Sequence, residues 1–144
     1  MKEIIISAIL MMLLLTGSTS IADNDKRQLV LQQLPEMMLQ HMMSNMRDHL
    51  QAINEILINL GNGDMDEAAE IAEQRLGMSS LKSHGTNHMA KFMPEGMRQA
   101  GAGMHKAASR FALKAQEGDL LSAYKMLSEV TSYCVTCHSG YRIK

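Results

Sequence analysis

The feature that most constrains the fold is a regular apolar pattern between residues 35 and 60. Apolar side chains recur there at alternating spacings of four and three residues, at Leu39, Met43, Met46, Leu50, Ile53, Leu57 and Leu60. Because an α-helix has about 3.6 residues per turn, this spacing places all of these side chains along one face. We therefore expect a long helix whose inner seam packs against other helices.

Three further segments carry helix start and stop signals. The second helix is expected to begin at Asp64, with Glu67 three residues later as in a capping box, and to stop at Gly77. The third is expected from Pro94 to Gly118 and the fourth from Asp119 to Gly140.

The stretch 77–93 has no clear period and reads as a long connection with room for a short helical turn. No run of the chain alternates with the period of two typical of strands. The sequence therefore predicts an all-α fold, an antiparallel up-down-up-down four-helix bundle.

The N-terminus has the layout of an export signal. Lys2 precedes an apolar run from Ile4 to Leu15, and the small residues Ser20 and Ala22 suit signal-peptidase cleavage after Ala22. The run is shorter than the roughly 20 residues that a membrane-spanning helix needs. We expect residues 1–22 to be a cleaved signal peptide and residues 23–144 to be a single domain in the periplasm. The net charge of −1 gives no reason to expect a nucleic acid or an anionic membrane as partner.

The motif that carries chemistry is Cys134-Val135-Thr136-Cys137-His138 near the end of the fourth helix. The spacing C-x-x-C-H is the haem c attachment pattern, since two thiols three residues apart on one helical face can bond the two vinyl groups of one porphyrin. His138 then lies close enough to ligate the iron. A zinc site would require a second pair of ligands, and a thioredoxin-like site would begin a helix rather than end one. A plain disulfide would leave His138 unexplained.

The ending Cys134, Cys137, His138, Tyr141 and Arg142, together with a Met-rich first helix, resembles the cytochrome c-prime family and its low-spin relatives, the class II c-type cytochromes. The resemblance implies a four-helix bundle with one covalent haem c. It also implies that low-spin members take a Met of the first helix as the distal iron ligand. High-spin members leave that position open and bind small gases. Members of the family often form homodimers through their first two helices.

Bundle geometry indicates where a distal ligand would lie. If the first and fourth helices are antiparallel neighbours, His138 faces roughly residue 42, which puts Met43 and Met46 at haem height on the predicted seam. The family pattern favours Met46, with Met43 as the alternative. Arg142 is close enough to reach a haem propionate, or else is a solvated Arg near the chain end.

The third and fourth helices are joined by a short turn, so counting residues back from that turn along both helices places positions near 98 of the third helix beside His138. Gly96, Gly101 and Gly103 cluster there, although each interior Gly costs a helix about 1 kcal/mol relative to Ala. We interpret the cluster as space kept for the haem; the alternative is a frayed helix start.

These features predict an electron-transfer protein with His and Met ligation that acts on redox partner proteins and is not an enzyme. The first alternative is a five-coordinate haem protein that binds gases such as nitric oxide. A more distant alternative is a copper carrier, because the run His41–Met46 and His49 offer soft ligands. His84 and His88 lie four residues apart and could pair on a metal, but satisfied or solvated histidines are the simpler interpretation.

Overall fold

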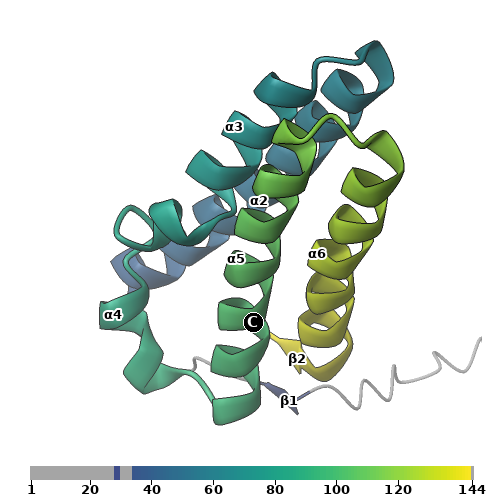
Figure 1. The fold of residues 1–144 in the computed structure, drawn as a ribbon. Helices are drawn as coiled ribbons and strands as arrows, with labels where there is room; N and C mark the ends of the chain where they lie inside the picture. The colour runs from purple at the N-terminus through teal and green to yellow at the C-terminus, as the bar shows by residue number, and fades with distance from the viewer. Residues whose placement is uncertain (1–27, 30–33, 144) are drawn as a thin grey trace, which may run out of the picture.

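The computed structural model describes residues 28–29 and 34–143, which are mostly helical and confirm the all-α prediction (Figure 1). The longer helices of this part of the chain are α2 (Glu36–Asn62), α3 (Met65–Arg75), α5 (Glu95–Gln116) and α6 (Leu120–Gly140). The connection from α3 to α5 contains the 3-10 turns η2 (Met78–Leu81) and η3 (Ala90–Phe92) and the short helix α4 (Thr86–Met89). Its expected helical turn is therefore present, with more helix than predicted. The proposed signal peptide lies outside the described residues.

The helix boundaries follow local signals. Gly63 ends α2 with φ of +85°, a left-handed conformation that Gly adopts without a steric penalty. Asp119 caps α6 as expected, because its side chain accepts a hydrogen bond from the backbone N–H of Ser122 at 3.1 Å. The capping box expected at Asp64 is wrong: the Asp64 side chain makes no capping hydrogen bond, and its ψ of 67° departs from the extended backbone of a usual N-cap.

The described helices pack as successive pairs around one main apolar cluster. Helix α3 packs against both α2 and α5, and α5 packs against α6 (Figure 1). The fully buried side chains of this cluster come from all four helices, with Phe111 of α5 the largest among them. The cluster also includes Ile56, Leu60, Ala69, Ala72, Leu76, Ala108, Ala115 and Val130. Small Ala side chains make up much of it, which allows these helices to approach closely.

The seam predicted for the first helix is only partly correct. The residues of α2 that are buried are Met42, His49, Ala52, Ile56 and Leu60. Leu50 and Leu57, which were expected on the seam, are exposed. Compared with the predicted seam, α2 is rotated about its own axis. It packs against α3, and the face that carries Ala52 and Ile56 therefore turns inward.

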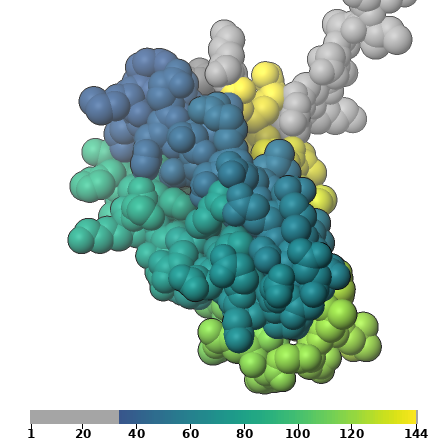
Figure 2. All heavy atoms as spheres, turned by 90° about the horizontal axis from the view of Figure 1, so that it is seen from above, coloured from purple at the N-terminus to yellow at the C-terminus, as the bar shows by residue number. Residues whose placement is uncertain are grey.

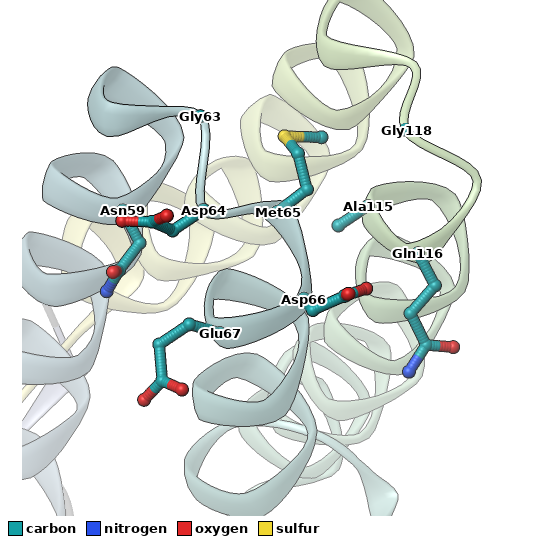
Figure 3. Close-up of a pocket in the computed structure, with 9 residues that line it drawn as sticks. All are labelled: Asn59, Gly63, Asp64, Met65, Asp66, Glu67, Ala115, Gln116 and Gly118. Atoms are coloured by element: carbon teal, nitrogen blue, oxygen red, sulfur yellow. The ribbon is translucent and has the colours of Figure 1, made fainter.

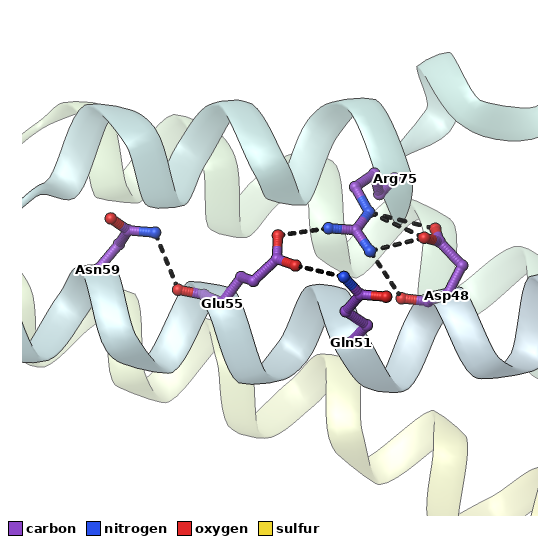
Figure 4. A network of polar contacts seen from close by, with 5 residues as sticks. All are labelled: Asp48, Gln51, Glu55, Asn59 and Arg75. Atoms are coloured by element: carbon purple, nitrogen blue, oxygen red, sulfur yellow. Dashed lines mark hydrogen bonds and ion pairs between the residues drawn. The ribbon is translucent and has the colours of Figure 1, made fainter.

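Polar contacts between α3 and α2 favour the same orientation of α2 about its axis. The Arg75 guanidinium of α3 reaches two carboxylates of α2, at 2.6 Å from Nη2 to Asp48 Oδ1 and at 2.5 Å from Nη1 to Glu55 Oε2 (Figure 4). The hydrogen bond from Arg75 lowers the pKa of Asp48. All three side chains are partly exposed, so each pair contributes at most about 1 kcal/mol, but together they set which side of α2 meets α3.

The Gly cluster of α5 sets its register against α6. A Cβ at Gly103 would overlap the ring of Tyr133, and a Cβ at Gly96 would overlap Tyr141 Oη. These contacts confirm the predicted alignment of α5 with α6, in which residues near 98 of α5 lie beside His138. They correct the interpretation of the cluster in part, because two of the three Gly residues make room for tyrosine side chains.

Substituting these glycines should give opposite effects on stability. Gly101→Ala is expected to stabilise the protein by up to about 1 kcal/mol, since a Cβ there meets no atom within 4 Å. Gly103→Ala should instead destabilise it by about 1–3 kcal/mol, because the Tyr133 ring must move. Urea unfolding measures both changes. In a Tyr133→Ala background, Gly103→Ala should become stabilising; if it remains destabilising, the ring contact is not the cause.

Candidate functional site

The C-x-x-C-H motif occupies the last turns of α6. The helix continues unbroken to Gly140, so Cys134 and Cys137 lie three residues apart on one helical face, as the sequence predicted. Both thiols are free and half-buried, and His138 is exposed. Burial raises the pKa of both cysteines, which keeps the thiols in their neutral form at neutral pH.

The motif is next to one apolar cluster, and the residues that follow it pack against another. Cys134 packs against the main cluster, whereas Tyr141, just past α6, packs against a second cluster. The second cluster has Leu34, Met42 and Met89 at its buried centre, and its half-buried rim includes Met38, Leu39, Phe92, Met93, Met97 and Ile143. Methionine dominates this second cluster, and its flexible thioether side chains adapt to irregular partners. An apolar and adaptable cluster therefore lies beside the chain segment that follows the motif.

The segment that follows α6 lies close to the start of α2, since Tyr141 belongs to the same cluster as Met42, whereas α2 and α6 themselves are not among the closely packed helix pairs. Strand β1 (Gln28–Leu29), which precedes α2, pairs in parallel with β2 (Tyr141–Arg142), which follows α6. In Figure 2 the C-terminal residues, in yellow, lie at the same end of the molecule as the beginning of α2, in blue. Arg142, the predicted propionate contact, is half-buried in this pairing.

The candidate distal methionines differ in burial. Met42 is 3% exposed and belongs to the second cluster, whereas Met46 is 37% exposed and Met43 is half-buried. The expectation that Met46 faces the interior is therefore not met in the described arrangement. Met46 lies one turn along α2 from Met42, so it remains near the motif end of the helix.

A separate hollow lies at the opposite end of the molecule. Its lining comes from the turn between α2 and α3 and from the end of α5, and includes Asp64, Asp66, Glu67 and Gln116 (Figure 3). Helix α6 begins at Leu120, two residues after Gly118 of the hollow, and Cys134 lies fourteen residues further on. At the helical rise per residue, this separates Cys134 from the start of α6 by about 21 Å. The hollow is open and polar, and it contains none of the predicted site residues.

A cluster of three buried histidines is the feature that the sequence did not predict. His49 of α2, His84 of the connection and His105 of α5 are 9%, 7% and 5% exposed. Their ring centroids are 4.9 Å apart for His49 and His84, 5.4 Å for His84 and His105, and 6.1 Å for His49 and His105. Three elements distant in sequence therefore bring their imidazoles to one point.

Hydrogen bonds fix the tautomers of two of these rings. His105 Nδ1 lies 2.7 Å from the Leu76 carbonyl oxygen, which can only accept, so Nδ1 carries the proton. Ser80 Oγ donates its hydrogen to the Gly77 carbonyl oxygen at 2.8 Å. It therefore accepts from His84 Nδ1, at 3.3 Å. In both rings Nε2 is left with its lone pair.

The third ring, that of His49, is the most perturbed. Its Nε2 is buried and has no hydrogen-bond partner. Burial, reinforced by the neighbouring His84 and His105, lowers the pKa of His49 to about 4. Burial also lowers the pKa of His84 and of His105. All three imidazoles are therefore neutral at pH 7.

Partial signals for this cluster are present in the sequence. His49 recurs seven residues after Met42 and seven before Ile56, which is the spacing of a buried position on α2. The pairing of His84 with His88, which was the less favoured interpretation, is not observed: His88 is exposed, as a solvated histidine would be, while His84 meets the two other histidines. Within the run suggested for copper, His41 is exposed and Met42 is buried, so these two adjacent ligands do not share a face.

Comparisons with protein-family models, with curated proteins and with solved structures return no match for this chain. Among the described residues, no helix combines the length and the apolar character needed to cross a bilayer.

Proposed function

We propose that this protein is an exported electron-transfer protein with one covalent haem c, held in an antiparallel up-down-up-down bundle of α2, α3, α5 and α6. The observation that carries the proposal is that Cys134, Cys137 and His138 lie on the last turns of an unbroken helix, with Cys134 packed against the main cluster and Tyr141, just beyond the motif, packed against the second. The resemblance of the chain's ending to class II c-type cytochromes supports the same function.

The residues present fit a haem in their chemistry. Two neutral, half-buried thiols on one helical face are the groups that thioether attachment consumes. A porphyrin needs an apolar surface on both faces, and the second cluster offers movable methionine side chains around Met42 and Met89.

In the proposed mechanism each residue has a distinct role. Cys134 and Cys137 would hold the haem through thioether bonds, and His138 would ligate its iron. When bound, the haem supplies a one-electron couple, whose potential a Met ligand and an apolar surround would raise. The second cluster keeps water away from one edge of the site, and Arg142 is proposed to contact a propionate.

The setting of this function is also proposed. Export by residues 1–22 would deliver the chain to the periplasm, where it would exchange electrons with redox partner proteins. The exposed apolar side chains of α2, among them Leu50 and Leu57, suit the homodimer that the family resemblance implies.

The visible spectrum of protein matured with the haem-attachment machinery tests the proposal. We expect a low-spin spectrum with a weak far-red sulfur-to-iron band in the oxidised state. A high-spin spectrum would instead favour the five-coordinate, gas-binding alternative. Absence of a Soret band would contradict both.

The distal ligand can be tested with single substitutions on α2. Met46→Ala is expected to remove the far-red band and to lower the reduction potential, because the thioether ligand is lost. Met37→Ala is the matched control, since Met37 lies on the same helix and is exposed. The assignment is wrong if only Met43→Ala removes the band.

A further inference from the structure

We propose that His49, His84 and His105 form a metal site, separate from the haem motif, that binds one first-row transition ion of the kind that imidazole prefers, with Zn²⁺ as its simplest occupant. No residue of the C-x-x-C-H motif belongs to this cluster, so the proposal does not depend on haem attachment. It differs from the copper-carrier alternative, since its ligands come from α2, the connection and α5 rather than from one run of sequence.

The spacing of the rings suits a single shared ion. Imidazole nitrogens bind Zn²⁺ at about 2.0–2.1 Å in tetrahedral geometry, which puts the centroids of three ligating rings about 5 Å from one another. The observed centroid separations of 4.9, 5.4 and 6.1 Å bracket this value. None of the rings is parallel to another, with interplanar angles of 44° to 85°, as expected for rings that surround a point rather than stack.

The donor atoms are in the form that a metal requires. His84 and His105 use Nδ1–H toward Ser80 Oγ and the Leu76 carbonyl, which leaves both Nε2 lone pairs for a ligand. Metal-ligating histidines usually donate their other ring N–H in this way to a carbonyl or a similar acceptor. The buried Nε2 of His49, without a hydrogen-bond partner, is a polar atom that a bound ion would satisfy.

The surroundings favour a neutral ligand set. At pH 7 the three imidazoles do not have to lose a proton before they bind, because burial holds the pKa of each below its ordinary value. Asp48, adjacent to His49, adds a negative charge near the site, although Arg75 pairs with it. Three protein nitrogens also leave a fourth position open for water or a small ligand.

Binding requires the rings to turn. As they stand, no three His, Cys, Asp or Glu side chains in residues 28–29 and 34–143 form a group that could hold a metal ion. Because His49 Nε2 makes no hydrogen bond that would be lost, we expect this ring to turn about its Cα–Cβ and Cβ–Cγ bonds and to bring Nε2 toward the other two rings when an ion binds. An ion bound there would tie the connection between α3 and α5 to both α2 and α5.

The experiment is zinc titration of the full mature chain by isothermal calorimetry, with metal content per polypeptide measured by mass spectrometry and iron counted separately. We expect one Zn²⁺ per chain, and tighter binding of Cu²⁺ in a parallel titration. His49→Leu and His105→Asn should each weaken Zn²⁺ binding by at least about 100-fold. The Asn side chain can keep a donor toward the Leu76 carbonyl, so the second variant removes the ligand with little structural change.

The control is His88→Asn, which changes an exposed histidine of α4 and should leave zinc affinity unchanged. Thermal unfolding with EDTA verifies that each variant folds, and His49→Leu should be at least as stable as the parent, because it removes a buried nitrogen that lacks a partner. Absence of stoichiometric zinc in the parent protein overturns the proposal. So does zinc binding that persists in His49→Leu, which would place the ion elsewhere, for example on the thiols.

Discussion

Metal-free protein is expected to lose about 3 kcal/mol of stability from His49 alone as the pH falls from 6.5 toward 4. The pKa of His49 is about 4 in the folded chain and near its ordinary value of 6.5 when unfolded, so the unfolded state binds the extra proton. Stability is therefore full above pH 6.5 and is lost as the pH decreases through this window. Burial is the main cause of the low pKa of His49; Arg75, and His84 and His105 once they are protonated, lower it further, and Asp48 raises it.

Urea unfolding in EDTA at several pH values between 4 and 7.5 measures this loss. His49→Leu should flatten the dependence by roughly the same 3 kcal/mol, leaving the smaller contributions of His84 and His105, whose pKa burial also lowers. Leu50→Ala, which changes an exposed and non-titrating residue of the same helix, should leave the dependence as it is. Equal slopes for His49→Leu and the parent would show that His49 is not held neutral by the fold.

Phe111→Ala is the second large effect, with an expected destabilisation of about 3–5 kcal/mol. Phe111 is the largest of the fully buried side chains and belongs to the main cluster, whose other members come from α2, α3, α5 and α6. Many residues of this cluster are Ala, whose side chains cannot extend into the cavity that the truncation leaves. We therefore expect the cavity to stay largely unfilled.

The matched control for this truncation is Leu113→Ala on the same helix. Leu113 is exposed, so its truncation should change the free energy of unfolding by less than about 0.5 kcal/mol. Chemical denaturation at pH 7 compares the two variants. A cost below about 1 kcal/mol for Phe111→Ala would mean that the four helices do not share one core.

The sequence predicted the helices well because their limits depend on local chemistry. Pro94 precedes α5, Asp119 caps α6 and Gly63 adopts a left-handed conformation, and each effect acts within one turn. The alignment of α5 along α6 was also predictable, because a short turn joins the two helices and sets their register. The contact of Gly103 with Tyr133 agrees with that register.

The rotation of α2 and the histidine cluster could not be predicted in the same way. Two apolar stripes compete on α2, one through Met46 and Leu50 and one through Met42 and Ile56, and the partner helix decides between them. His84 lies in a connection without a period, so nothing local places it beside His105. Contacts between elements distant in sequence determine both features.

The most direct test of the proposed cytochrome is the intact mass of the mature protein, measured under denaturing conditions after expression with the haem-attachment machinery. A haem joined through Cys134 and Cys137 should survive denaturation, so we expect the mass of the polypeptide plus one haem. The Cys134→Ala/Cys137→Ala double variant, made in the same way, should have the polypeptide mass alone. A parent protein that is colourless and has only its polypeptide mass would contradict the account.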